Sequence, residues 1–407
     1  MRPSRNTRRA SIDMARCVLA ILGLKPRRIG GVETFARELS RQLGELGWTS
    51  VLAFLAPAPE PVRRFLDLPN TVLEVLEDSV RPSARVLGDT AALLRKHRPQ
   101  ILHLQFTSFL SAYPWLARLH GVRKIFFTEQ TSYPEGFVPT RAALWKRAMG
   151  RFVAWPFSRV VCISDYIANC YVTRGYVPRG RVCRVYNSVD TRRESGDAER
   201  FRARFAIPRD RAVVLQVGSL TAEKGVLDLL EAARLVVAAE PAAHFVLAGD
   251  GPLLDQSVRY AEQVGLGANV TWTGLLSDPI ADGAYAAADV VCQLSRWQEG
   301  FGFTIAEAMS CGRPVVAARV GAIPELVADG RCGFLVAPGN AAEVASKLLR
   351  LLQNRSLRLN LGTAARVIAQ ERFDVVRNVA ELVSLYGIAP VPPGREAGRH
   401  FHDDSMS

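Results

Sequence analysis

Two carboxylates, Glu299 and Glu307, flank a glycine-rich segment that leads into a predicted helix. A carboxylate accepts hydrogen bonds from neighbouring hydroxyl groups, so the pair suits a sugar and a ribose. Either glutamate alone would more often be a surface charge. Together they enclose glycines in an otherwise apolar region, which favours a site for a ligand rich in hydroxyl groups.

The start of that helix is a candidate phosphate site. Gly300 and Gly302 surround Phe301, and the helical pattern begins at Phe303 or Thr304 and stops at the sequence CGRP. Glycines immediately before a helix leave backbone N–H groups free to meet a phosphate, and the helix dipole adds to the attraction. A phosphate bound here would lie between the two carboxylates.

A lysine, Lys224, lies in a turn between a strand that ends at Gly218 and a helix that begins near Gly225. The turn falls at the carboxyl edge of the predicted sheet, where open α/β sheets bind their ligands. A lysine there can neutralise a departing diphosphate. A solvated loop lysine is the alternative if this motif is taken alone.

Two weaker candidates lie in the first half of the chain. Gly30 and Gly31 follow the first strand and precede a helix, which fits either a phosphate loop or a tight turn, because the full G-x-G-x-x-G pattern is missing. His103 ends another strand, where it either faces a ligand or is a buried, hydrogen-bonded structural histidine. The chain has no H-E-x-x-H or Walker A sequence, and no Asp-x-Asp pair placed to hold a metal.

These residues need a scaffold of strands and helices, and the pattern of the chain supplies one. Buried apolar runs alternate with helical patterns such as VETFARELSRQLGELG. The runs are CVLAIL, SVLAFL, QILHL, KIFFT and RVVCI in the first half and AVVLQVG, HFVLAG, VTWTG, DVVCQL, PVVAA and GFLVA in the second. Buried strands separated by helices indicate parallel sheets of βαβ units. The pattern stops in a polar segment and restarts with a strand at Ala212. We therefore expect an α/β fold of two doubly wound, Rossmann-like domains with a ligand in the cleft between them.

The predicted boundaries divide the chain into five parts. The parts are a basic leader (1–15), an N-terminal domain (16–190), a C-terminal domain (191–375), a C-terminal helix (376–389) that could return to the first domain, and a disordered tail (390–407). The tail is rich in Pro, Gly and polar residues, which is typical of disorder.

Composition limits the class of protein. Of 407 residues, 48% are hydrophobic and 22% charged, which is ordinary for a globular protein and excludes collagen, a coiled coil and wholesale disorder. No run approaches about 18 apolar residues, and the basic start lacks a small-residue cleavage site, so we expect a cytoplasmic protein without a signal peptide or transmembrane helix. Seven cysteines without C-x-x-C spacing indicate reduced, mostly buried thiols.

Positive charge is concentrated in the first half. Residues 1–190 carry 29 Lys and Arg against 14 Asp and Glu, whereas residues 191–407 carry 23 against 25. Such an excess suggests an anionic partner. The stretch 141–159 interleaves five basic residues with Trp145, Met149, Phe152 and Trp155. It predicts either a helix on an anionic bilayer or a helix packed on a sheet with a solvated basic face.

The segment QEGFGFTIAEAMSCGRPVVAARVGAIPELV resembles the signature of glycosyltransferase family 4, whose members are retaining enzymes with two Rossmann-like domains in the GT-B fold. Glu299 and Glu307 match the family's Glu, seven residues, Glu pattern. Shorter matches are GGVE at 30–33, VGSLTAEKG at 217–225 and GDGP at 249–252. The resemblance spans about residues 17–388 and is more specific in the C-terminal half.

The resemblance implies a nucleotide-diphosphate sugar donor on the second domain and a variable acceptor site on the first. Glu307 would hold ribose hydroxyls, Glu299 would hold sugar hydroxyls, and Lys224 would stabilise the leaving phosphate. The acceptor would attack from the same face, and helix dipoles with positive groups would replace a metal. The implied donor-binding residues are Gly30, Gly31, Gly218, Ser219, Lys224, Gly251, Glu299, Gly300, Phe301, Gly302, Phe303, Thr304 and Glu307, and the expected acceptor-side residues are Glu129, Gln130 and Tyr133.

Two positions depart from the family pattern. Ser219 stands where the family usually has an arginine. The substitution removes one of two cationic contacts to the phosphate. An arginine of segment 26–28 could supply the missing contact from across the cleft. The chain has His103-Leu104-Gln105 where the family often has His-x-His, and a glutamine can hydrogen-bond a hydroxyl but cannot take charge. His103 and Gln105 are kept as catalytic candidates beside Lys224 and Glu299.

We predict a retaining, metal-independent glycosyltransferase of the hexosyl-transferring type, with no cofactor besides its nucleotide-sugar donor. The expected role is synthesis of a cell-surface glycan, polysaccharide or glycolipid on a glycan or lipid-linked acceptor. No recognised nucleic-acid-binding module is present, so no nucleic-acid partner is expected. An anionic membrane surface is one optional partner, with the protein peripheral on the inner face. The alternative is a catalytically impaired nucleotide-sugar-binding protein of the same fold.

Overall fold

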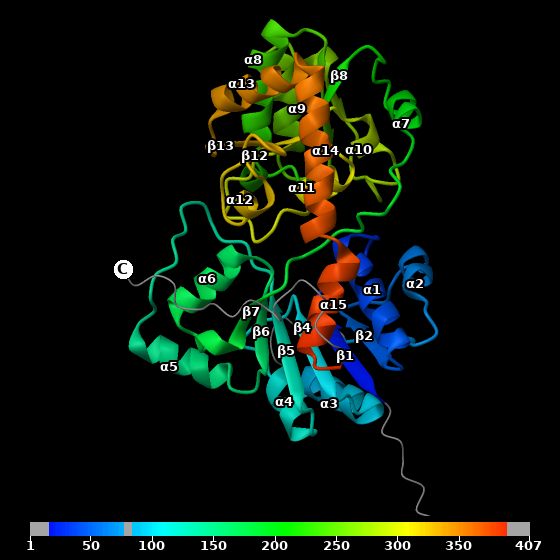
Figure 1. Cartoon of the computed structure of the whole chain (residues 1–407), viewed down its shortest axis with the longest axis vertical. Helices are drawn as coiled ribbons and strands as arrows, with labels where there is room; N and C mark the ends of the chain where they lie inside the picture. The colour runs from blue at the N-terminus through cyan, green and yellow to red at the C-terminus, as the bar shows by residue number, and fades with distance from the viewer. Residues whose placement is uncertain (1–15, 77–83, 389–407) are drawn as a thin grey trace, which may run out of the picture.

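The computed structural model describes residues 16–76 and 84–388. Two parallel β-sheets, of seven and six strands, form two α/β domains that stack along the long axis of the molecule (Figure 1). This is the fold class that the sequence predicts. The predicted basic leader (1–15) and disordered tail (390–407) lie outside the described residues.

The first domain is built on a sheet in the order β3-β2-β1-β4-β5-β6-β7, in which all neighbours are parallel. Its central strands are continuous buried runs, as expected for a sheet covered by helices on both faces. The two strands that the apolar runs do not predict, β3 and β7, are the edge strands. The strands are β1 (Cys17–Leu22), β2 (Thr49–Phe54), β3 (Thr71–Val75), β4 (Ile101–Gln105), β5 (Lys124–Glu129), β6 (Arg159–Cys162) and β7 (Val182–Arg184).

Helices connect these strands and end at recognisable local signals. For example, α6 begins after Ser164, whose side chain accepts a hydrogen bond from Ile167 N, and ends at Gly175 with φ of 72°. The helices are α1 (Gly31–Glu45), α2 (Glu60–Leu66), α3 (Ala84–His97), α4 (Tyr113–Leu119), α5 (Leu144–Val153) and α6 (Asp165–Arg174), and a 3₁₀ turn, η1 (Arg179–Arg181), precedes β7.

The second domain is built on a sheet in the order β10-β9-β8-β11-β12-β13, also parallel throughout. All its strands coincide with predicted apolar runs. They are β8 (Ala212–Val217), β9 (Ala243–Ala248), β10 (Val270–Trp272), β11 (Val290–Gln293), β12 (Val315–Ala318) and β13 (Gly333–Val336).

The helices of the second domain include the one predicted from the glycine-rich motif, which is α11 and runs from Phe303 to Ser310 as expected. The α-helices are α7 (Ala198–Arg204), α8 (Val226–Ala239), α9 (Leu254–Gln263), α10 (Ala284–Ala287), α11 (Phe303–Ser310), α12 (Ile323–Leu326), α13 (Ala341–Leu352) and α14 (Arg355–Arg372), and the 3₁₀ turns are η2 (Ala222–Lys224) and η3 (Gly267–Asn269).

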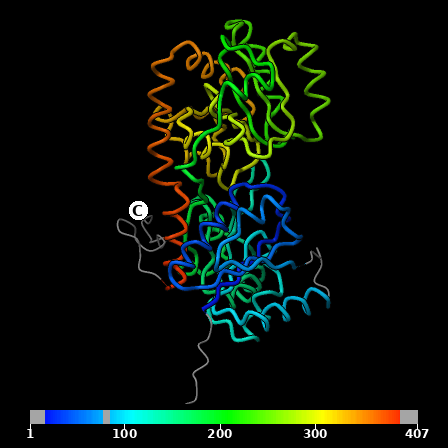
Figure 2. Tube along the Cα trace, turned by 90° about the vertical axis from the view of Figure 1, so that its right-hand side faces the viewer, coloured from blue at the N-terminus to red at the C-terminus, as the bar shows by residue number. Residues whose placement is uncertain are grey.

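The chain crosses between the domains twice, and the two crossings pair with each other. Val189 N donates to Phe373 O at 2.9 Å, and Val375 N donates to Val189 O at 3.0 Å. The chain then continues as α15 (Val375–Leu385), which packs along α1 of the first domain. Figure 2 shows α14 and α15 running down one side of the molecule, one beside each domain. The C-terminal helix therefore lies on the N-terminal domain.

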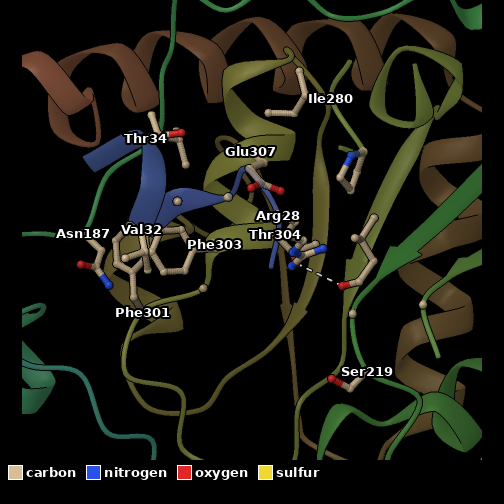
Figure 3. Close-up of a pocket in the computed structure, with 18 of the residues that line it drawn as sticks. Arg28, Val32, Thr34, Asn187, Ser219, Ile280, Phe301, Phe303, Thr304 and Glu307 are labelled. Atoms are coloured by element: carbon tan, nitrogen blue, oxygen red, sulfur yellow. Dashed lines mark hydrogen bonds between the residues drawn. The ribbon is translucent and has the colours of Figure 1, made fainter. Parts of the chain in front are cut away.

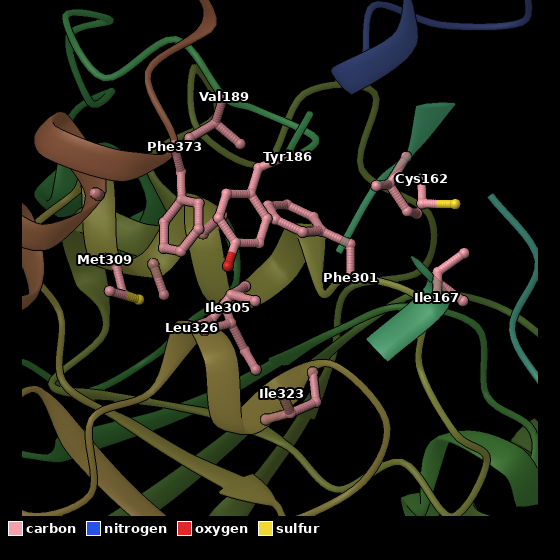
Figure 4. Packing of buried hydrophobic residues seen from close by; sticks show 14 of the residues in the cluster. Cys162, Ile167, Tyr186, Val189, Phe301, Ile305, Met309, Ile323, Leu326 and Phe373 are labelled. Atoms are coloured by element: carbon pink, nitrogen blue, oxygen red, sulfur yellow. The ribbon is translucent and has the colours of Figure 1, made fainter. Parts of the chain in front are cut away.

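An apolar core joins the two domains (Figure 4). Phe301 from the second domain contacts Phe373 with ring centroids 5.6 Å apart, and Phe373 contacts Tyr186 at 5.4 Å. Such edge-to-face contacts add to the free energy gained by burying apolar area. The contact fixes the loop before α11 relative to the first domain, and that loop carries the predicted site.

The cysteine prediction is confirmed, since all seven residues are free and six are buried. Among the described residues, no helix has the length and apolar character needed to cross a bilayer.

Candidate active site

A cleft of about 640 Å³ lies between the two sheets, at the carboxyl ends of strands from both domains (Figure 3). Open parallel sheets bind ligands at this edge, because the loops and helix N-termini gather there. Most of the lining residues lie within segments 24–34, 130–132 and 187–190 of the first domain and within 216–219, 248–250, 275–280 and 299–307 of the second, together with Arg193 and Lys224.

Glu299 and Lys224 are brought together in this cleft. Lys224 Nζ donates to Glu299 Oε1 at 2.5 Å, and Ser295 Oγ donates to the same oxygen at 2.5 Å. Ser132 Oγ, from the first domain, lies 3.4 Å from Glu299 Oε2. The glutamate is buried while the lysine side chain is 38% exposed. The result is a fixed carboxylate beside a cation that can be reached from the cleft.

Glu307 lies on α11, where its carboxylate lines the cleft. Tyr285 OH donates to Glu307 Oε2 at 2.6 Å, which orients the group. Burial raises the pKa of Glu307, and the Tyr285 hydrogen bond and the positive charge of Arg28 oppose that rise. Figure 3 shows Glu307 with Arg28 close by, from the loop that precedes α1.

The start of α11 has the geometry that the glycine-rich motif predicts. Gly302 has φ of 132°, a region that favours glycine, and a Cβ there would lie 2.8 Å from Ile323 Cδ1. Thr304 Oγ1 donates to Val217 O at 3.1 Å, which ties the first turn of α11 to the end of β8 (Figure 3). The backbone N–H groups of Phe303 and Thr304 belong to the first turn, which leaves them outside the helix's own hydrogen bonds.

The Gly30–Gly31 loop meets α11 from the other side of the cleft. A Cβ on Gly31 would lie 2.4 Å from the Phe303 ring, so only glycine permits this approach. Gly30 N donates to Glu33 Oε2 at 3.0 Å, which closes the start of α1. Two helix N-termini therefore face the same cleft, one from each domain. The start of α11 attracts an anion through its free N–H groups, whereas at the start of α1 the Glu33 carboxylate already accepts from Gly30 N.

Three cations of the loop between β1 and α1 also line the cleft, namely Lys25, Arg27 and Arg28. Ser219 lines the opposite wall. The arginines of segment 26–28 thus border the same cleft as Ser219, as the predicted replacement requires. Arg193 is a further cation of the lining, and it forms an ion pair with Asp278.

His103 and Gln105 are not among the residues that line the cleft. His103 is fully buried, with Nε2 2.6 Å from Thr128 Oγ1 and Nδ1 2.6 Å from Tyr386 OH. Burial lowers its pKa to about 3. Gln105 is also buried, and its Oε1 accepts from Gln130 Nε2 at 3.0 Å. Of the two interpretations of His103, the geometry agrees with the buried structural histidine.

The acceptor-side residues lie at the end of β5 and in the loop that follows it, with different surroundings. Glu129 is buried and accepts hydrogen bonds from Thr131 N and Tyr171 OH. Gln130 lines the cleft. Tyr133 exchanges backbone hydrogen bonds with Gln298 of the second domain, at 2.9 and 2.8 Å. This bridge holds Ser132 beside Glu299.

The remaining predicted glycines pack closely around the end of β8. Gly218 lines the cleft, and a Cβ on Gly249 would lie 1.8 Å from Gly218 O. Gly251 instead packs on the backbone of Leu220 and is not part of the lining. Gly249 and Asp250, which the sequence did not indicate as site residues, line the cleft in place of Gly251.

The residues that sequence reasoning missed are those that orient the predicted ones. Ser132, Ser295 and Tyr285 come from three separate segments and carry no motif of their own. Their role depends on contacts between distant parts of the chain. Among the described residues, no group of three or more His, Cys, Asp or Glu is placed to hold a metal ion.

Two family models match successive parts of the chain. The model for Glycosyltransferase Family 4 matches residues 29–193, and the model for Glycosyl transferases group 1 matches residues 197–367. Together they cover both domains and most of the cleft.

Several curated proteins are similar over part of their length. Alpha-D-kanosaminyltransferase of Streptomyces kanamyceticus is 27% identical over 70% of this chain and 75% of its own. N-acetyl-alpha-D-glucosaminyl L-malate synthase of Bacillus anthracis is 29% identical over 51% of this chain and 54% of its own. D-inositol 3-phosphate glycosyltransferase of Mycolicibacterium smegmatis is 31% identical over 60% and 57%. The chain thus spans little more than half of the last two.

Solved structures share the two-domain architecture over nearly the whole chain. HepE from Anabaena, solved with UDP and glucose, superposes with a TM-score of 0.73 at 19% identity, covering 92% of this chain and 99% of its own. A glycosyltransferase from Rickettsia africae gives 0.74 at 18% identity, covering 92% and 98%. At such identities the likeness concerns the fold.

Proposed function

The chain belongs to glycosyltransferase family 4 and has the GT-B fold of two facing Rossmann-like domains, and on that premise we propose a retaining transfer from a nucleotide-diphosphate sugar to an acceptor hydroxyl. One observation carries this proposal. Glu299, Glu307 and Lys224 meet in one cleft with two helix N-termini, although Lys224 lies 75 residues before Glu299 in the chain. That combination can hold hydroxyl groups and a diphosphate at once.

The donor would lie mainly against the second domain. Glu307 accepts hydrogen bonds from the ribose hydroxyls, and Glu299 accepts them from the sugar. The backbone N–H groups at the start of α11 and the Gly30–Gly31 loop surround the diphosphate. HepE, which shares this fold, was solved in complex with UDP and glucose, which supports a nucleoside diphosphate as the donor's nucleotide part.

In the proposed reaction the bond between the sugar's anomeric carbon and the phosphate oxygen breaks, and the acceptor oxygen bonds to the same face of that carbon. The acceptor's proton passes to the leaving phosphate. Lys224 and the two helix N-termini stabilise the negative charge that develops there. We propose that these groups make a metal ion unnecessary.

A second cation at the diphosphate would come from the first domain. Ser219 offers no charge, whereas Arg28 lies across the cleft near Glu307. We therefore propose that Arg28 provides the charge-assisted contact that an arginine at position 219 would otherwise make. Arg28→Ala should slow transfer, and Ser219→Arg should restore part of the rate.

The first test is a thermal-shift screen with UDP-, GDP- and ADP-sugars and the matched nucleoside diphosphates, all in EDTA. A ligand that binds only the native state raises the melting temperature. A shift from one nucleotide identifies the base and shows binding without a divalent metal. NMR of the glycoside then gives the anomeric configuration, and inversion would contradict the retaining mechanism.

The proposed role is synthesis of a cell-surface glycan, polysaccharide or glycolipid, on a glycan or lipid-linked acceptor. A peripheral location at the inner face of a membrane fits such an acceptor. Ser219 favours one alternative, a nucleotide-sugar-binding protein with impaired catalysis. Donor binding without transfer or slow donor hydrolysis would support that alternative.

A further inference from the structure

The outer face of the first domain exposes an unusual amount of apolar surface. We call the surface of α4, α5 and the residues around them the α4–α5 face. Eight of the fifteen large hydrophobic residues exposed in the described chain lie between positions 110 and 155. They are Leu110, Leu119, Val138, Leu144, Trp145, Met149, Phe152 and Trp155.

Helix α5 does not use its apolar side chains for packing on the sheet. None of its residues is buried, and Trp145 and Phe152 are 61% and 66% exposed. The sequence allowed two interpretations of segment 141–159, and the one in which its helix packs on a sheet through its apolar side is therefore wrong. Exposed aromatic clusters of this kind mark interaction sites in folded proteins.

Aromatic contacts hold the two helices of this face together. The Trp115 ring on α4 lies 5.1 Å from the Phe152 ring and 5.7 Å from the Trp155 ring, centroid to centroid. Trp155, which follows α5, is itself 61% exposed. The exposed apolar surface is thus presented by a packed unit rather than by isolated side chains.

The charge along the α5 segment of this face has one sign. No Asp or Glu occurs between Glu135 and Asp165. Arg141, Lys146 and Arg151 are exposed in that interval. Lysine and arginine beside tryptophan suit the boundary between lipid headgroups and acyl chains, since the stems pack on apolar groups while the charges reach phosphates.

The α4–α5 face is separate from the cleft. Neither helix contributes a residue to the cleft lining. Figure 1 shows both helices at the end of the first domain that is remote from the second domain. A partner bound there leaves both domains free to bind substrates.

We propose that the α4–α5 face binds the surface of an anionic bilayer. The apolar residues of α5 enter the interface, and the surrounding cations contact acidic headgroups. The uniformly positive charge of segment 136–164 favours an anionic lipid surface over a second copy of this face, because the two α5 segments would repel each other. The consequence that the cleft is held near a lipid-linked acceptor rests on the proposed function, whereas the binding itself does not.

The test is flotation of the full chain with vesicles of phosphatidylcholine alone or with about one third phosphatidylglycerol, at low and high salt. We expect binding only to the anionic vesicles, weakened by salt. Lys146→Glu with Arg151→Glu should reduce binding by about tenfold or more. Trp145→Ala with Met149→Ala should also reduce it, because apolar burial contributes to the affinity.

A matched control reverses two exposed arginines on the second domain, Arg355→Glu with Arg366→Glu on α14. This control should bind anionic vesicles like the unchanged protein. Absence of binding, equal binding by all variants, or equal binding to neutral vesicles would overturn the proposal. So would self-association in solution that the Trp145→Ala, Met149→Ala variant abolishes. Nucleotide-sugar thermal shifts, measured on the same samples, report separately on the proposed function.

Discussion

The two walls of the cleft use their polar residues in opposite ways. On the C-terminal wall, Glu299 and Glu307 line the cleft, and each is held by a neighbouring hydroxyl group. On the N-terminal wall, His103 and Gln105 belong to the central strand β4 and do not line the cleft; His103 bonds to Tyr386, and Gln105 bonds to Gln130, which does line the cleft. Polar residues near the carboxyl edges of two similar sheets thus have different roles.

The difference comes from what covers each sheet. Helix α15 returns from the second domain and places Tyr386 against His103. The N-terminal wall therefore contributes to the cleft through the glycine loop before α1 and the cations Lys25, Arg27 and Arg28. Position at the carboxyl edge of a sheet is necessary for a site residue, but it does not suffice.

The largest effect is expected at Lys224 on the C-terminal wall. Lys224→Ala should slow transfer by about 100- to 1,000-fold, or ~2.7–4 kcal/mol, because it removes a preorganised cation from the leaving phosphate. Donor affinity should change much less. Lys347→Ala, on the outer helix α13, is the matched control. Steady-state kinetics with donor binding measured separately check both, and intact turnover in Lys224→Ala would contradict the assigned role.

A smaller effect is expected at Glu307, mainly on donor binding. Glu307→Ala should weaken the donor by ~1.5–3 kcal/mol, because it removes a charged hydrogen-bond acceptor. Burial raises the pKa of Glu307, so protonation should weaken donor binding as the pH falls towards that raised value. Calorimetry over a pH series measures both effects. A donor affinity that Glu307→Ala leaves unchanged would remove Glu307 from the donor site.

The N-terminal wall should instead respond in stability. The pKa of His103 is lowered from 6.5 to about 3 in the folded protein. Below about pH 6.5 the unfolded chain therefore takes up a proton that the folded chain does not, so stability falls as the pH falls. His103→Gln should reduce the slope of unfolding free energy by up to about 1.4 kcal/mol per pH unit between about pH 6 and 5.

Tyr386→Phe is the control for that experiment. It keeps the imidazole but removes one hydrogen bond, so it should lower stability by about 1 kcal/mol and keep the pH slope. Denaturant titrations at several pH values measure both variants. If His103→Gln instead abolished transfer while the slope stayed as before, the histidine would belong to the reaction and the contrast between the walls would fail.

The smallest effect is expected at Tyr285, which orients Glu307. Tyr285→Phe should weaken donor binding by about fivefold, or ~1 kcal/mol, because Glu307 loses one hydrogen bond. Tyr260→Phe is a matched control, since Tyr260 OH also donates to a carboxylate, Glu231, but on helices outside the cleft. Equal donor affinities of the two variants would show that Tyr285 does not position Glu307.

Local patterns in the sequence were sufficient for much of the fold. All strands of the second sheet follow from apolar runs in the sequence, because a strand buried on both faces is a nearly continuous run of apolar residues. The helix α11 follows from glycines before it and CGRP after it. The prediction of the first sheet missed two strands, because β3 is a half-exposed edge strand and β7 has only three residues, Val182–Arg184.

The sequence by itself determined the chemistry of the C-terminal wall, because Glu299, Glu307 and the glycines between them lie within one motif that also builds its own helix. Only the tertiary structure decided that Lys224 meets Glu299, that His103 is covered by α15, and that the apolar side of α5 stays exposed. Spacing along the chain encodes the local backbone conformation. Which distant surface covers a given face depends instead on many weak contacts between segments far apart in sequence.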